Sequence, residues 1–141
     1  MLSSSLNRVV ARRTLTSASS KCWASTLVVS EPLVDGNATP PGTQSAVTAA
    51  SQLGQAVDLL VIGDSAPSKI PEGVSKVYHV AIGDQLSESA ANAIQVVASS
   101  KDCNKVVGTS SKWGSTVIPR AAALLDASPI TDILQIESEG K

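Results

Sequence analysis

Aromatic side chains are almost absent from this 141-residue sequence, which has no Phe, one Tyr and two Trp. Its core must therefore be built from small aliphatic residues, which suit a sheet packed closely between layers of helices. No apolar run approaches the roughly 18 residues that a membrane-spanning helix needs, so we expect no direct membrane span. Hydrophobic residues make up 43% and charged residues 16% of the chain, a composition typical of a folded domain.

Cysteine and histidine are also scarce. Only Cys22 and Cys103 occur, without the spacing of a disulfide framework or a zinc site. We interpret Cys103 as a small residue at the start of a buried strand. His79 is the only histidine and has no neighbouring carboxylate pair to orient it as a general base. We therefore expect no catalytic residues, no metal site and no enzymatic activity in this chain.

Acidic residues are missing from the first thirty positions, which instead carry Arg8, Arg12, Arg13 and Lys21 among many Ser and Thr residues. This composition is typical of a mitochondrial targeting presequence, which we assign to residues 1–24. A disordered basic tail is the alternative interpretation. Without those four cations the chain has seven Lys or Arg against twelve Asp or Glu, a net charge of −5. An acidic domain of this kind is not expected to bind nucleic acid.

Residues 25–141 alternate between strand and helix patterns and are predicted to form one domain. Short aliphatic runs predict strands, and apolar residues at helical spacing predict helices. The expected strands are 25–30, 57–62, 74–80, 105–108 and 132–136, and the expected helices are 43–53, 87–99 and 114–125. Two prolines leave at most a helical turn in 64–73. This order predicts a three-layer α/β/α domain with a Rossmann-like, doubly wound parallel sheet of about five strands.

A ligand crevice in such a sheet forms outside the carboxyl ends of the strands, where the strand order reverses. With the order 3-2-1-4-5, loops 31–42 and 108–114 face that point. The second loop could cradle an anion or nucleotide at a helix N-terminus. Its candidate residues are Gly108, Thr109, Ser110, Ser111 and Gly114. However, the loop lacks both the Walker and the dinucleotide glycine patterns, and tight turn geometry and helix capping also favour glycine and serine.

Four residues are candidates for contact with another molecule. Lys112 and Trp113 share the loop, and an indole beside glycine and lysine commonly anchors an interface. The alternative for Trp113 is that it covers the adjacent helix end. Arg120 lies in the last helix and Asp132 begins the last predicted strand. That strand would form an open sheet edge, which favours a covering partner.

Several motifs in the chain resemble the alpha subunit of electron-transfer flavoprotein. They are Gly108-Thr-Ser-Ser-Lys-Trp-Gly114, Ile118-Pro-Arg-Ala-Ala-Ala-Leu124 and Pro129-Ile-Thr-Asp-Ile133, in the family's order. Segments 25–29 and 48–54 agree as well, so the resemblance covers essentially everything after the presequence. It implies a protein of the mitochondrial matrix, or of the matrix side of the inner membrane, that pairs with a beta-like subunit. Such dimers pass electrons from dehydrogenases towards quinone.

The resemblance also implies that FAD is held by a carboxyl-terminal domain beyond Lys141, so this chain would be a scaffold without its own cofactor. Segment 64–73 is shorter than the corresponding helical segment of the family. Together with a reading frame that runs from Met1 to a polar end, this favours a second hypothesis: a non-redox accessory subunit of a larger mitochondrial respiratory assembly. A free-standing adenine-nucleotide-binding module, using loop 108–114, is the third hypothesis.

Overall fold

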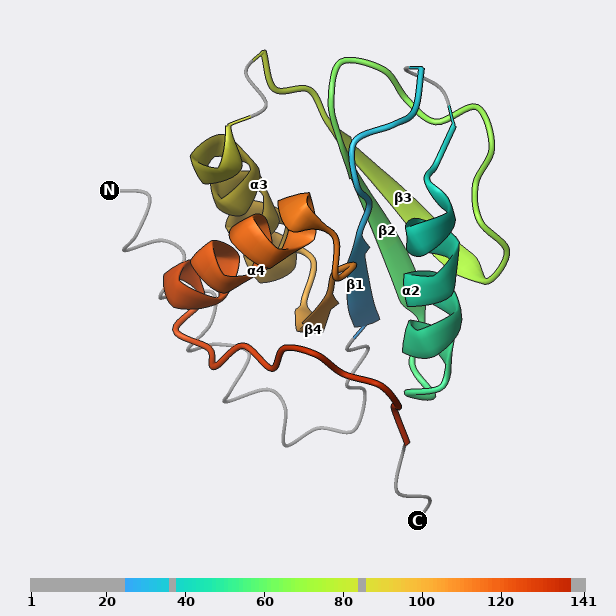
Figure 1. Ribbon diagram of the computed structural model, residues 1–141, viewed down its shortest axis with the longest axis vertical. Coiled ribbons are helices and arrows are strands. Elements are labelled where there is room, and N and C mark those ends of the chain that lie inside the picture. The colour runs from blue at the N-terminus through green and yellow to red at the C-terminus, as the bar shows by residue number, and fades with distance from the viewer. Residues whose placement is uncertain (1–24, 36–37, 84–85, 138–141) are drawn as a thin grey trace.

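The computed structural model describes residues 25–35, 38–83 and 86–137, which form three layers (Figure 1). The middle layer is a parallel sheet of four strands in the order β3-β2-β1-β4. The strands are β1 (Ser25–Val29), β2 (Val57–Ile62), β3 (Val74–Val80) and β4 (Cys103–Val107). Helix α2 (Pro41–Ser51) covers one face, while α3 (Ser87–Ser100) and α4 (Lys112–Leu124) cover the other.

The predicted doubly wound α/β fold is confirmed, and the strand order reverses between β1 and β4 as expected. Every residue of β1 and β2 is buried, which explains why both strands appear in the sequence as short apolar runs. Segment 64–73 contains turns and bends and no helix, consistent with the prediction for this crossover.

The predicted fifth strand at 132–136 is wrong. Residues 128–137 belong to no strand of the described sheet, and Ile130 and Leu134 are 78% and 100% exposed. Pro129 has no N–H to donate to a sheet, and Asp132 has a left-handed backbone with φ 56°, which interrupts an extended path. The aliphatic pattern thus identified an apolar segment but not its conformation. In the described part of the chain, β4 is therefore an edge of the sheet.

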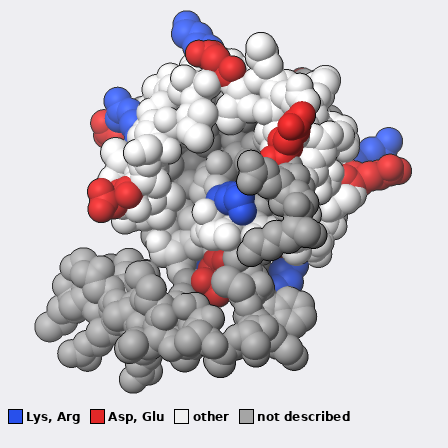
Figure 2. Space-filling view, turned by 90° about the horizontal axis from the view of Figure 1, so that it is seen from below, with Lys and Arg blue, Asp and Glu red and all other residues white. Residues whose placement is uncertain are grey.

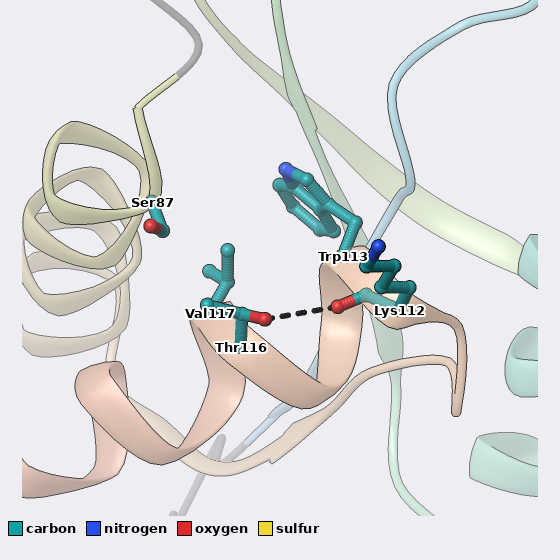
Figure 3. A pocket seen from close by; sticks show the side chains of 5 residues that line it. All are labelled: Ser87, Lys112, Trp113, Thr116 and Val117. Atoms are coloured by element: carbon teal, nitrogen blue, oxygen red, sulfur yellow. Dashed lines mark hydrogen bonds between the residues drawn. The ribbon is translucent and has the colours of Figure 1, made fainter.

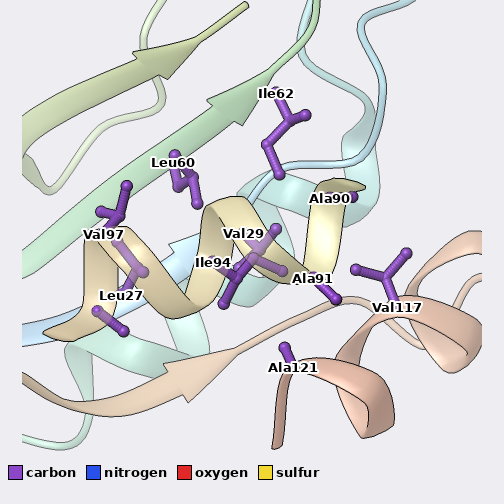
Figure 4. Packing of buried hydrophobic residues seen from close by; sticks show 11 residues of the cluster. Leu27, Val29, Leu60, Ile62, Ala90, Ala91, Ile94, Val97, Val117 and Ala121 are labelled. Carbon is purple, nitrogen blue, oxygen red and sulfur yellow. The ribbon is translucent and has the colours of Figure 1, made fainter. Parts of the chain in front are cut away.

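The core lies on both faces of the sheet and contains no aromatic residue among the buried hydrophobic side chains of the described residues. Between the sheet and helices α3 and α4, aliphatic side chains from the strands meet alanines from the helices (Figure 4). The labelled members are Leu27, Val29, Leu60, Ile62, Ala90, Ala91, Ile94, Val97, Val117 and Ala121. A smaller cluster under α2 includes Val28, Val47, Leu59 and Val61. The small alanine side chains allow the helices to approach the sheet closely.

Candidate functional site

The two loops expected at the reversal point meet there and pack against each other. Gly42 is the second residue of α2, and a Cβ atom added to it would lie 3.0 Å from Glu31 Oε1 and 3.4 Å from Thr109 Cγ2. The Ser30 and Thr43 hydroxyl oxygens lie 3.4 Å apart, and both residues are buried. The two loops therefore come close together outside the carboxyl ends of β1 and β4, where a crevice was expected.

Two hydroxyl groups of loop 108–114 lie at the beginning of α4, and one of them caps the helix. Ser111 is the N-cap, and its Oγ accepts a hydrogen bond of 3.1 Å from the backbone N–H of Gly114. The Thr109 and Ser111 hydroxyl oxygens lie 3.2 Å apart, while Ser110 is exposed. This capping also explains why α4 begins at Lys112, two residues before the predicted start.

The two glycines of the loop allow close packing of the loop on its own helix. A Cβ at Gly108 would lie 2.5 Å from Ile118 Cγ1, and one at Gly114 would lie 2.1 Å from the Thr109 carbonyl oxygen. Ile118 and Thr109 lie where these Cβ atoms would be, so both glycines are needed for the close packing of the loop on α4. A phosphate cradle needs backbone N–H groups that are free to donate, whereas the Gly114 N–H already donates to Ser111 Oγ. We assign no step of flavin chemistry to these residues.

A pocket of about 420 Å³ opens beside the loop, between the amino-terminal ends of α3 and α4 (Figure 3). Ser87 and Lys112 are the first residues of α3 and α4, and Trp113, Thr116 and Val117 complete the lining. Trp113 is half-buried, Lys112 is exposed, and the Thr116 hydroxyl donates to the Lys112 carbonyl oxygen at 3.0 Å. An indole, an aliphatic wall and one cation at the rim suit the side chain of another protein.

Arg120 and Asp132, the other two interface candidates, do not line this pocket. Arg120 Nη1 donates to Glu88 Oε1 at 2.9 Å and so links α4 to the first turn of α3. Both side chains are exposed, so this ion pair contributes little stability. Asp132 lies in the exposed segment that follows α4. The structure therefore brings Lys112 and Trp113 together in one pocket. Arg120 instead pairs with Glu88 in the first turn of α3.

The single histidine and the described cysteine each contact another residue of the sheet or of the loop that follows it. His79 is exposed near the end of β3, and its Nε2 lies 2.7 Å from the Gly63 carbonyl oxygen. Cys103 starts β4 as predicted, but the strand is not buried, because Asn104 and Lys105 are exposed at the sheet edge. No cluster of three or more potential metal ligands occurs among residues 25–35, 38–83 and 86–137. Over the same ranges, no helix has the length and hydrophobicity needed to cross a bilayer.

A polar row that joins all four strands was not predicted from the sequence. Ser25, Asp58 and Cys103 lie at or near the amino-terminal ends of β1, β2 and β4, and the Tyr78 side chain reaches Asp58 from the fifth residue of β3. Asp58 is only 4% exposed, and its Oδ2 accepts a hydrogen bond of 2.9 Å from the Ser25 hydroxyl. The Tyr78 hydroxyl donates to the same oxygen at 3.5 Å, and Cys103 Sγ lies 3.3 Å from Ser25 Oγ. The signal was available: a single carboxylate within the buried run of β2 needs hydrogen-bonding partners.

The surroundings of Tyr78 raise the pKa of its phenol. Burial raises the pKa of Tyr78 above its ordinary value of 10.0, and the neighbouring Asp58 carboxylate raises it further. Lys101 Nζ lies 5.5 Å from the centroid of the Tyr78 ring, on the exposed side of the row. Three of the four residues of this row lie at or near the amino-terminal ends of their strands, whereas the Trp113 pocket lies at the beginning of α4, which follows the carboxyl end of β4.

The fold and the site together define a doubly wound α/β domain whose reversal-point loop is packed on itself and whose open pocket suits a protein contact. The family model described as "Electron transfer flavoprotein domain" matches residues 26–141. The chain belongs to this family.

Curated relatives agree with the motifs found in the sequence, so the resemblance to the alpha subunit is confirmed. The chain is 39% identical over 123 residues to "Probable electron transfer flavoprotein subunit alpha, mitochondrial" of Caenorhabditis elegans, covering 81% of this chain and 36% of that protein. It is 32% identical over 130 residues to "Electron transfer flavoprotein subunit alpha, mitochondrial" of Arabidopsis thaliana, covering 83% and 35% respectively. The chain thus spans about a third of the length of these relatives.

Proposed function

We propose that residues 25–141 act as the amino-terminal scaffold domain of an electron-transfer flavoprotein alpha-type subunit, and that this chain supports partner proteins without holding FAD itself. The match of the family model to residues 26–141, on a chain that aligns with about a third of its relatives, carries this proposal. The lack of both the Walker and the dinucleotide glycine patterns in loop 108–114 supports it. Electron transfer from dehydrogenases towards quinone is then a property of the assembly.

The proposed location is the mitochondrion, on the matrix side. Two observations support this location: the basic, acid-free composition of the amino-terminal segment and the word "mitochondrial" in the names of the relatives. Residues 1–24, the proposed presequence, lie outside the residues that the structure describes. Import into isolated mitochondria, followed by mass analysis of the product, tests both the location and the cleavage of this segment.

The Trp113 pocket is the proposed contact for a beta-like subunit. Its half-buried indole and aliphatic wall can bury an apolar side chain of the partner, while Lys112 can pair with a neighbouring carboxylate. Trp113→Ala should weaken binding of a co-expressed beta-like subunit at least about tenfold, within the usual range for an aromatic anchor. Lys112→Glu should also weaken binding. The same change at Lys69, another exposed lysine, in the β2–β3 loop, should not.

The composition of the native complex decides between the scaffold and the accessory-subunit hypotheses. The chain is isolated from its source under mild conditions, and the mass and visible spectrum of the complex are recorded. A complex of heterodimer size that contains a beta-like subunit and flavin supports the scaffold proposal. A larger flavin-free assembly contradicts it and supports the accessory-subunit hypothesis.

A further inference from the structure

We propose that the Trp113 pocket selects a partner segment in which an aliphatic side chain is followed by a carboxylate, and that Arg120 sets this preference by neutralising Glu88. The inference rests on the partner-binding role proposed above for this pocket, and it names the chemistry of the residues that the pocket accepts. It also gives a role to Arg120, which does not line the pocket.

The wall of the pocket favours an aliphatic side chain. Val117 is buried in this wall, and the half-buried Trp113 indole lies beside it (Figure 3). The Thr116 hydroxyl donates to the Lys112 carbonyl oxygen and is therefore already engaged as a donor. An apolar side chain of a partner would lose contact with water against this wall, and that loss favours binding.

The charge at the rim favours a carboxylate next to that side chain. Lys112 is exposed, and residues 25–35, 38–83 and 86–137 form no ion pair with it. A carboxylate of a partner that reaches the rim can therefore pair with the Lys112 ammonium group. Complementary charges of this kind determine which partner binds more than how tightly it binds.

Glu88 is a carboxylate of the chain itself beside the pocket, and its charge would repel an acidic partner. It follows Ser87, which lines the pocket, in the first turn of α3. Arg120 neutralises this charge from the other helix, because its Nη1 donates to Glu88 Oε1 at 2.9 Å. The fields of two adjacent opposite charges largely cancel, so Lys112 carries the net charge at the rim.

The helical period of α4 places Arg120 close to the pocket. Arg120 comes three residues after Val117 and four after Thr116, and residues at these spacings lie on one side of a helix. It therefore lies one turn beyond the wall, where its charge acts on the pocket without contact with a bound side chain. Since the ion pair is exposed, it influences the charge preference of the pocket more than the stability of the domain.

Another face of the molecule shows no such preference. On the face seen from below in Figure 2, acidic and basic side chains are interspersed and neither sign gathers in one place. The Trp113 pocket differs because an unpaired cation lies next to an apolar wall.

Dipeptide probes test the preference on the purified full chain. The probes are N-acetyl dipeptide amides of leucine followed by glutamate, glutamine or lysine. Their binding is followed at low ionic strength by NMR of the Trp113 indole N–H, which Trp113→Phe identifies. The glutamate probe should bind about two- to fivefold more tightly than the glutamine probe, and the lysine probe should bind least, because one exposed charge pair contributes this much. Added salt should reduce the differences. Equal affinities, or no binding of any probe, overturn the proposal.

A double-variant cycle tests the role of Arg120. Arg120→Gln should weaken binding of the glutamate probe about twofold and strengthen binding of the lysine probe by a similar factor, because Glu88 is then unpaired. Adding Glu88→Gln should restore both affinities. Lys69→Gln, the control, removes an exposed cation in the β2–β3 loop and should change neither affinity. A double variant as weak as Arg120→Gln alone would show that Arg120 acts through the shape of α4, and the proposal would be wrong.

These outcomes are separable from those of the proposed function. Probes that bind in the expected order, on a chain with which no beta-like subunit associates, would support the charge preference and contradict the partner assignment. A beta-like subunit that binds a chain with equal affinity for the three probes would support the partner assignment and overturn the charge preference.

Discussion

At the residue scale, the buried carboxylate of Asp58 depends on the two hydroxyl groups beside it. The Ser25 hydroxyl, at 2.9 Å, is the shorter of its two contacts, and both Ser25 and Asp58 are at most 5% exposed. A charge in such a position is tolerated only when hydrogen bonds replace the lost water. This dependence makes Ser25 a position at which the removal of one oxygen atom should have a measurable effect.

Ser25→Ala should lower the free energy of unfolding by about 1–3 kcal/mol, because it removes a donor from a buried carboxylate. Ser45→Ala is the control, since Ser45 is exposed on α2 and should change stability by less than about 0.5 kcal/mol. Urea unfolding of both variants gives the comparison. Equal effects of the two substitutions would contradict the role assigned to Ser25.

Tyr78 should make stability fall at alkaline pH. Its pKa is raised in the folded state, so the neutral phenol is favoured there, and its contribution to stability is fully present below the unfolded value of 10.0. This contribution should be lost as the pH rises from 10.0 through the folded pKa.

Because Tyr78 is the only tyrosine, the ultraviolet absorbance of the phenolate reports on this residue alone. Unfolding of Tyr78→Phe over the same pH range supplies the control, because lysines also titrate there. A midpoint at or below 10.0 would be inconsistent with a partly buried phenol beside a carboxylate.

At the scale of elements, the turn from β4 into α4 depends on the absence of a side chain at Gly114. A Cβ there would overlap the Thr109 carbonyl oxygen, which is backbone and cannot move aside easily. Gly114→Ala should therefore lower the free energy of unfolding by at least about 2 kcal/mol, in the range of strained or overpacked sites. Gly83→Ala is the matched control, because nothing lies within 4 Å of its added Cβ. Similar melting temperatures for the two variants would contradict this account of the turn.

The elements that the sequence predicted well are those fixed by local pattern and burial. Strands β1 and β2 are buried throughout, and α3 has its apolar residues on one face, so composition and periodicity located all three. The segment 132–136 has similar aliphatic content, but its conformation depends on whether a neighbouring strand receives it. That information is tertiary, and the positive φ of Asp132 is not visible in a hydrophobic pattern.

The site was predicted less completely than the fold, for the same reason. The sequence located loop 108–114 at the reversal point and singled out Lys112 and Trp113. It did not reveal that Ile118 covers Gly108, or that Ser87 from α3 completes the pocket, because both depend on how two helices pack. The polar row around Asp58 combines four strands and was missed for that reason.

At the scale of the whole molecule, the proposed function depends on a surface that another protein can contact. Two aliphatic clusters stabilise the four-stranded sheet, and the glycines of the reversal-point loop pack against Ile118 and Thr109. The Trp113 pocket is the proposed contact for a partner. Under the proposed function, such a domain would position its partners while the cofactor is held elsewhere in the assembly.

Titration of the purified full chain with FAD tests this central claim most directly. Flavin fluorescence and the visible spectrum are followed during the titration, and the sample is then separated by gel filtration. We expect no quenching that saturates and no flavin eluting with the chain, because the proposed scaffold role leaves FAD to another part of the assembly and the Gly114 N–H of loop 108–114 already donates to Ser111 Oγ. Flavin retained in a one-to-one ratio by this chain alone would contradict the scaffold account.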